Sequence, residues 1–209
     1  MTDLRRSLLR GMSGIVSDLY GQPTPKKTAV CKAADEPVPA NPPALPPFEA
    51  LWRTADDSID WTDILVSPTP TDGLTPPAEW AFLHGQADAV LHGDQAAYLA
   101  VLSRVNPMAD LLPYVAALEV TTVDSDTLRA SFTPRPDLMD GDAQSYLCGM
   151  AVRIARDLFA ALPVLTVEVT IPGYALVVAF SRAQMNKVRF AFIDPVEFAK
   201  KCGATFLEE

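Results

Sequence analysis

Pro163 separates two periodicities, and this junction constrains the fold more than any other feature of the chain. Before it, residues 142–162 repeat apolar side chains every three to four positions, as a helix does. After it, residues 165–171 alternate apolar and polar side chains, as a strand does. The apolar arc of the helix covers about half of its circumference, which is wider than a single buried stripe. The junction therefore predicts a long central helix that is buried on more than one side and followed directly by a strand.

Strand patterns occur on both sides of this helix. Residues 117–122 and 127–132 alternate in polarity around an Asp-Ser-Asp turn, which predicts a hairpin with one solvent-exposed face. Residues 165–171 and 174–181 predict a second hairpin around a Pro-Gly turn. The strand of residues 174–181 is apolar on both faces, so we expect it to lie centrally in the sheet, covered on each side.

Further helices are expected before and after these strands. Residues 75–105 predict two helices in succession, with Thr75 capping the first and Asp94 capping the second. Asp194 followed by Pro195 predicts another helix start. Three tryptophans are interpreted as core anchors: Trp52, Trp61 and Trp80. The expected fold is α+β: a helical hairpin, then a ββαββα unit with a mostly antiparallel or mixed sheet around the long buried helix.

The first 20 residues place apolar side chains at helical spacing among arginines, which predicts a basic amphipathic helix. The stripe expected to dock a partner contains Leu8, Met12, Ile15 and Leu19. Such a stripe packs on the protein's own core, on a second copy or on another protein, or it contacts a membrane surface.

The rest of the chain divides into a linker and one domain. Residues 21–47 contain eight prolines, which fix φ and remove backbone donors, so neither helix nor sheet is expected to persist there. Residues 48–209 are expected to form a single α+β globular domain, with a helical part over 48–113 and a sheet-containing part over 114–209.

Charge is distributed unevenly along the chain. Residues 1–34 contain six basic and two acidic side chains, a net charge of +4. The remaining residues contain 11 basic and 24 acidic side chains, a net charge of −13. Because such a body repels phosphate backbones, it is not expected to bind nucleic acid directly. The basic segment either folds back on the body or binds an external partner.

The chain has no uninterrupted apolar stretch of the roughly 20 residues that a spanning helix needs. Arg10 also interrupts the apolar run that a secretory signal requires. The three cysteines, Cys31, Cys148 and Cys202, have no spacing typical of a zinc site or a disulfide framework. We therefore expect a cytoplasmic protein without a transmembrane segment.

Catalytic motifs are missing from the sequence, and no cofactor is expected. His84 and His92 supply two imidazoles without a nearby third ligand, so no metal site is predicted. Four charged side chains are candidates for contact with a ligand or partner: Arg129, Arg153, Arg156 and Glu168. Arg153 is spaced to pair with Asp157 at i and i+4, whereas Arg156 has no partner within its own helix. Small neighbours of Arg156 leave room for another backbone or for an anionic ligand.

Four segments of the chain carry a resemblance over roughly residues 58–209; they are residues 58–70, 90–114, 144–169 and 190–198. GD-x-x-AYL, R-x-AR-x-x-FA-x-LP and IDP are similar to landmarks of an uncharacterised bacterial family, often found as the C-terminal part of proteins with a small N-terminal domain. That family has no known activity, so the resemblance implies no catalytic residue. In related chains the long helix tends to begin after an acidic residue beside the tyrosine. Here residues 144–146 are Gln-Ser-Tyr and supply no carboxylate, so no role of that acidic residue carries over to this chain.

These features favour a non-enzymatic interaction or accessory protein, whose acidic body and basic N-terminal helix engage a protein partner or a second copy. Two alternatives remain. The first is a hydrolase or nuclease-like enzyme with a site on the sheet near Arg129 and Glu168. The second is a sensor of a small anionic ligand that uses Arg153 and Arg156. Both alternatives require these side chains to converge in one pocket.

Overall fold

The computed structural model describes residues 28–30, 48–55, 57–73, 75–174 and 176–205. The predicted docking stripe of Leu8, Met12, Ile15 and Leu19 lies outside the described residues, as does most of the proline-rich segment. In chain order the elements are β1 (Thr28–Val30), η2 (Phe48–Arg53), α2 (Trp61–Val66), α3 (Pro77–Leu91), α4 (Gln95–Val105), η3 (Ala109–Tyr114), β2 (Val115–Thr122), β3 (Thr127–Pro134), η4 (Pro136–Leu138), α5 (Ala143–Ala161), β4 (Thr166–Ile171), β5 (Leu176–Ser181), α6 (Arg182–Met185), η5 (Phe190–Phe192) and α7 (Pro195–Lys201).

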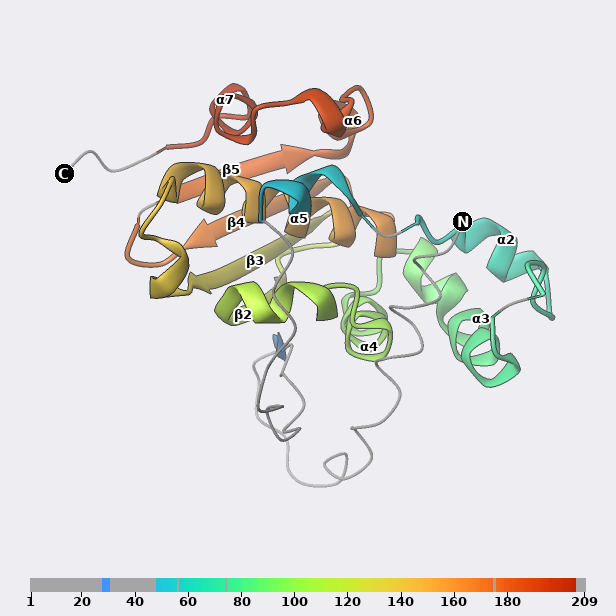
Figure 1. Ribbon diagram of the computed structural model, residues 1–209. Helices are drawn as coiled ribbons and strands as arrows, with labels where there is room; N and C mark the ends of the chain where they lie inside the picture. The colour runs from blue at the N-terminus through green and yellow to red at the C-terminus, as the bar shows by residue number, and fades with distance from the viewer. Residues whose placement is uncertain (1–27, 31–47, 56, 74, 175, 206–209) are drawn as a thin grey trace.

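The strands form one sheet in the order β1-β2-β3-β4-β5. β3 and β4 run parallel, whereas the other neighbouring pairs are antiparallel. Parallel neighbours need a crossover connection, and α5 supplies it between β3 and β4 (Figure 1). The prediction of a protein with both helices and a mixed sheet is therefore confirmed.

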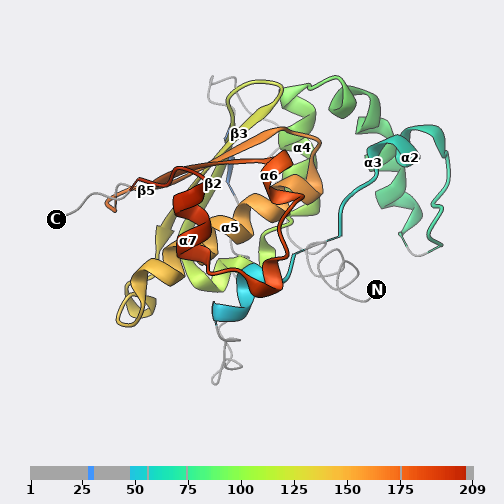
Figure 2. The ribbon, with the colours of Figure 1, turned by 90° about the horizontal axis from the view of Figure 1, so that it is seen from above.

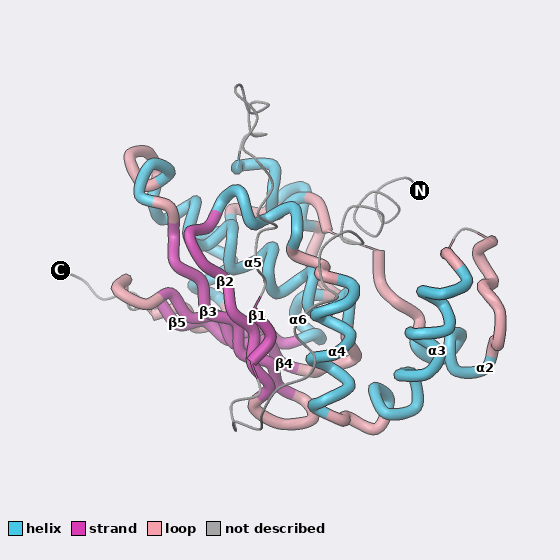
Figure 3. The backbone as a smooth tube through the Cα atoms, turned by 90° about the horizontal axis from the view of Figure 1, so that it is seen from below, coloured by secondary structure: helices cyan, strands magenta, loops and turns pink. Residues whose placement is uncertain are grey.

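Helices cover one face of the sheet. Figure 3 shows the strands gathered on one side of the molecule and the helices on the other. Side chains along β3 and β4 alternate between buried positions on the covered face and more exposed positions on the open face. The open face carries threonines and charged side chains, which suits contact with water.

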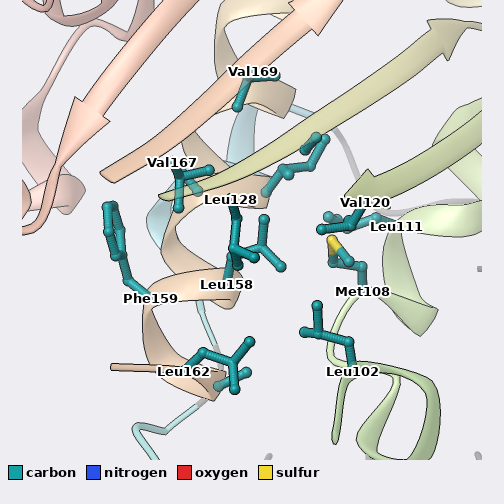
Figure 4. Close-up of a cluster of buried hydrophobic side chains, with 14 of the residues drawn as sticks. Leu102, Met108, Leu111, Val120, Leu128, Leu158, Phe159, Leu162, Val167 and Val169 are labelled. Atoms are coloured by element: carbon teal, nitrogen blue, oxygen red, sulfur yellow. The ribbon is translucent and has the colours of Figure 1, made fainter. Parts of the chain in front are cut away.

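α5 lies at the centre of the core. Every residue from Tyr146 to Ala161 except Arg156 is buried. The helix packs on β4 on one side and on η2 on the other, and α7 lies beside it, so α5 is enclosed between two layers (Figure 2). Figure 4 shows Leu158 of α5 beside Leu128 of β3 and Val167 of β4. The predicted long helix with burial on more than one side is confirmed.

Aspartate side chains begin three of the helices, as predicted for Asp94 and Asp194. The carboxylates of Asp94, Asp142 and Asp194 each accept a backbone N–H from the first turn of α4, α5 and α7. The prediction that Thr75 caps α3 is wrong, because α3 begins at Pro77 and the Thr75 hydroxyl donates to Asp72. The proline ring already fixes φ at the helix start, so α3 begins without a side-chain cap.

The three tryptophans predicted as core anchors are buried, which confirms that interpretation. Trp61 also donates its indole N–H to the carbonyl of Ala161, at 2.9 Å between the two atoms, and so ties α2 to the end of α5. α2 and α3 lie together at one end of the molecule, beyond α4 (Figure 1). Among the described residues, no helix has both the length and the apolar composition needed to cross a membrane.

Two expectations about strands are corrected. β5 ends the strand order, so the prediction that it lies centrally and covered on each side is wrong. Val177 of β5 is 49% exposed. β-branched side chains favour strands whether or not the face they occupy is covered, so an apolar residue at this position does not show that the strand is central. The expectation that no strand persists over residues 21–47 is wrong for Thr28–Val30, which contains no proline and pairs with β2.

Candidate functional site

The predicted contact residues Arg129 and Glu168 form an ion pair on the open face of the sheet. They are register partners on the parallel strands β3 and β4, which places both side chains on the same face. Arg129 Nη2 lies 2.6 Å from Glu168 Oε2, and its Nε lies 2.9 Å from the same oxygen. Both side chains are partly exposed, so the pair contributes only about 0–1 kcal/mol to stability.

Arg153 lies on the opposite side of the covering layer and is almost completely buried. Its Nε donates to the carboxylate of Asp157 at 2.7 Å, which confirms the predicted i, i+4 pair. Its Nη2 donates to Asp110 at 2.9 Å, and its Nη1 donates to the hydroxyl of Thr54 at 3.0 Å. Two carboxylates and a hydroxyl therefore hold the guanidinium, and this arrangement fixes η2 and η3 against α5.

Arg156 also binds η2, through backbone carbonyls. Its Nη1 donates to the carbonyl oxygens of Trp52 and Thr54. Its guanidinium lies 4.1 Å from the centre of the Phe190 ring, which is a cation–π contact. Burial lowers the pKa of Arg156 from its ordinary value. The backbone that approaches Arg156 is thus η2 of the same chain, and it passes over Gly149, where an added Cβ would lie 2.5 Å from the Trp52 ring.

The structure brings the four predicted contact residues together only in pairs. Arg129 and Glu168 lie on the open face of the sheet, whereas Arg153 and Arg156 point from α5 toward η2. A shared pocket, which the enzyme and the Arg153/Arg156 sensor hypotheses need, is therefore not formed by these side chains. Within the described ranges, no group of three His, Cys, Asp or Glu side chains is arranged to hold a metal ion.

A third arginine, Arg182, lines a groove of about 480 Å³ between α2 and the end of α5. Arg182 donates to the carbonyl oxygens of Phe159, Leu162 and Val164, so it satisfies carbonyls that the end of α5 leaves without helical partners. Burial lowers its pKa from the ordinary value of an arginine. These contacts give Arg182 a structural role.

A second groove, of about 500 Å³, lies along α6, η5 and α7 and is the best candidate for a functional site. The two helices that border it, α6 and α7, each begin at a side-chain cap. Ser181 and Gln184 form a capping box that begins α6 immediately after β5. Asp194 caps α7, with Pro195 at the first helical position. We call this the α6–α7 groove; it is lined by Gln184, Lys187, Val188, Arg189, Phe192, Ile193, Phe198, Lys201 and Cys202.

Aromatic contacts support the floor of the α6–α7 groove. The Phe198 ring stacks on Phe180 of β5 with a centroid distance of 6.0 Å, and it meets the edge of Phe190 at 5.9 Å. Phe190 in turn carries Arg156 on its face. The floor is therefore connected through ring contacts to both the sheet and α5, and such contacts limit movement of the floor.

The rim of the α6–α7 groove is basic. Lys187, Arg189 and Lys201 are exposed, and none of them forms an ion pair with a carboxylate of the described residues. None of the described residues that line the groove is acidic. Phe192 is 85% exposed, the highest value among the large apolar side chains that the structure describes. The groove thus combines an exposed aromatic ring with three cations in a protein whose total charge is −9.

The periodicity of the sequence does not reveal this groove, because residues 182–188 fit a short helix and a strand equally well. A local charge count would have indicated it. Residues 182–202 hold five basic and two acidic side chains, a net charge of +3 within a strongly acidic body. Phe192 lies in the middle of this stretch.

Comparison of the chain with models of known protein families, with curated proteins and with solved structures finds no match. The resemblance to an uncharacterised bacterial family therefore stays a prediction.

Proposed function

We propose that this protein is a non-enzymatic interaction or accessory protein that binds a protein partner in the α6–α7 groove. The observation that carries the proposal is the 85% exposure of Phe192 in a groove lined by three cations that form no ion pair with the described carboxylates. Aromatic side chains and arginine are enriched at the centres of protein interfaces.

The energetics favour a covered state of this surface. Burying a phenylalanine side chain contributes about 1.5–3 kcal/mol, and Phe192 gains almost none of this on folding because its ring stays in water. A partner that covers the ring gains that contribution. The aromatic floor beneath it is packed on β5 and α5, so a partner meets a surface that is already ordered.

The basic N-terminal helix is proposed as a second contact of the same protein, on sequence grounds alone. Its stripe of Leu8, Met12, Ile15 and Leu19 is outside the described residues. Deletion of residues 1–47 tests this part by light scattering of the purified protein. A change in mass supports self-association through the segment, and an unchanged mass together with unchanged partner recovery contradicts any docking role for it.

Site-specific photocrosslinking tests the groove. A benzoylphenylalanine replaces Phe192 in the full chain, expressed in the cells that normally produce it. The matched control carries the same group at Val66, which is 70% exposed on α2, far from the groove in the sequence. We expect one discrete protein adduct at position 192 that the control lacks, identified by mass spectrometry.

Purified components complete this test. The identified protein should bind the wild-type chain, and Phe192→Ser should weaken that binding about tenfold or more, as expected for an aromatic side chain at the centre of an interface. Equal adducts at positions 192 and 66, or equal affinity of the wild type and the Phe192→Ser variant, would show that the groove is not the interaction site.

A further inference from the structure

We infer that the segment which fills the α6–α7 groove is an acidic peptide with a bulky apolar side chain between its carboxylates. This inference rests on the proposed function and adds the chemical class of the partner. It follows from the separation of an apolar floor and a cationic rim in the same groove.

The rim selects negative charge. Lys187, Arg189 and Lys201 surround the groove without an ion-pair partner among the described carboxylates. Lys200, the neighbour of Lys201 on α7, shows the opposite behaviour: its Nζ lies 3.1 Å from the carboxylate of Glu197, and it does not line the groove. Among the described residues, a lysine outside the groove is therefore paired with a carboxylate, whereas the groove lysines are not, which suits contact with carboxylates of a partner.

The floor selects an apolar anchor. Val188, Ile193, Phe198 and Cys202 are half-buried beneath the rim. A volume of about 500 Å³ accommodates a few side chains rather than a whole domain. A peptide that places one phenylalanine or leucine on this floor also covers the ring of Phe192.

A peptide fits this groove better than a small molecule or a nucleic acid does. Small-molecule sites usually bury most of the ligand, whereas the rim side chains here are exposed and Phe192 stands in solvent. A phosphate backbone running beyond the groove would meet a body in which acidic side chains exceed basic ones by 13 outside the first 34 residues. A short acidic peptide contacts only the basic rim of the groove and does not extend over the acidic body.

Fluorescence polarisation with the full-length protein tests the inference. The probe is a fluorescein-labelled peptide of sequence EEFLEE, and the comparison peptides are QQFLQQ and KKFLKK. We expect EEFLEE to bind at least about tenfold more tightly than QQFLQQ, because three rim cations contribute. KKFLKK should show no binding. Raising the salt from about 0.05 to about 0.5 M should weaken EEFLEE binding.

Two adjacent lysines give a matched pair of variants. Lys201→Glu changes a rim residue and Lys200→Glu changes a lysine outside the groove, and both change the net charge by the same amount. Lys201→Glu should weaken EEFLEE binding by about fivefold or more, whereas Lys200→Glu should change it less than about twofold. Phe192→Ser, at an exposed position, should weaken it by about tenfold.

Several results would overturn the inference. Equal binding of EEFLEE and QQFLQQ would remove the acidic requirement, and equal effects of the two lysine variants would reduce it to the net charge of the protein. Displacement of the probe by millimolar inorganic phosphate, but not by sodium chloride of the same ionic strength, would assign the groove to a small anion. A dimer that Phe192→Ser dissociates would assign it to a second copy. A crosslinked partner at position 192 combined with no EEFLEE binding would retain the proposed function and refute only this peptide chemistry.

Discussion

Replacement of Gly149 by alanine should destabilise the protein, although alanine is the better helix former. Gly149 lies in the middle of α5, where η2 crosses the helix. A Cβ at this position would lie 2.5 Å from Cε3 and 3.0 Å from Cζ3 of Trp52, well inside normal contact distance. Trp52 is buried, and its backbone carbonyl accepts a hydrogen bond from Arg156. The ring therefore cannot move away without disturbing the attachment of η2.

The magnitude follows from two opposing effects. Exchanging a helical glycine for alanine gains about 1 kcal/mol of helix propensity. Forcing a methyl group into a packed core costs about 1–3 kcal/mol, and the contact at 2.5 Å with an anchored ring belongs at the upper end of that range. We therefore expect Gly149→Ala to lower the free energy of unfolding by about 1–2 kcal/mol.

Urea denaturation followed by circular dichroism measures this change. Gly85 in α3 is the matched control, because a Cβ there meets nothing within 4 Å. Gly85→Ala should raise the free energy of unfolding by about 0.5–1 kcal/mol. In a Trp52→Leu background the cost of Gly149→Ala should shrink by more than about 1 kcal/mol, since the steric conflict is gone. If Gly149→Ala stabilises the protein as Gly85→Ala does, the close packing of η2 on α5 is refuted.

Three further predictions concern buried side chains. Asp157→Asn should lower the free energy of unfolding by about 3 kcal/mol in urea denaturation, because it leaves the buried guanidinium of Arg153 without its fully buried carboxylate; no measurable loss would contradict that role. Burial raises the pKa of Glu79, so the wild type should lose stability as the pH rises through that raised pKa. Glu79→Gln should therefore gain stability relative to the wild type between pH 4.5 and 8 in thermal unfolding, and a constant difference would refute this reasoning. Burial also raises the pKa of the Cys148 thiol to about 12. A thiol reagent at pH 8 should therefore modify Cys148 only at the rate of unfolding. Rapid modification of Cys148 in the native protein would contradict its burial.

The periodicity of apolar residues predicted the helices and strands that bury an apolar face. α5 was predictable because its apolar residues exceed a single stripe and Asp142 and Pro163 mark its ends. The hairpins around it followed from alternation and turn residues in the same way. The position of β5 was not predictable, because an apolar residue such as Val177 fits an exposed edge strand as well as a central one.

The contacts of charged residues were only partly predictable. The Arg153–Asp157 pair follows from helical spacing, but the contacts of Arg153 with Thr54 and Asp110 join segments 43 to 99 residues apart. The small neighbours of Arg156 were compatible with either a close backbone or an anionic ligand, and which of the two lies there depends on how η2 crosses α5. Exposure of Phe192 depends on tertiary packing, which no local pattern encodes.

Chemical-shift mapping shows where on the protein an acidic peptide binds. The unlabelled EEFLEE peptide is added to uniformly ¹⁵N-labelled full-length protein, and the amide shifts are recorded during the titration. If the peptide occupies the α6–α7 groove, saturable shifts are concentrated in residues 184–202, with the amides of Arg129 and Glu168 on the open face of the sheet unchanged. Shifts centred on the sheet face or on α2 and α3, with residues 184–202 unaffected, would contradict binding in this groove.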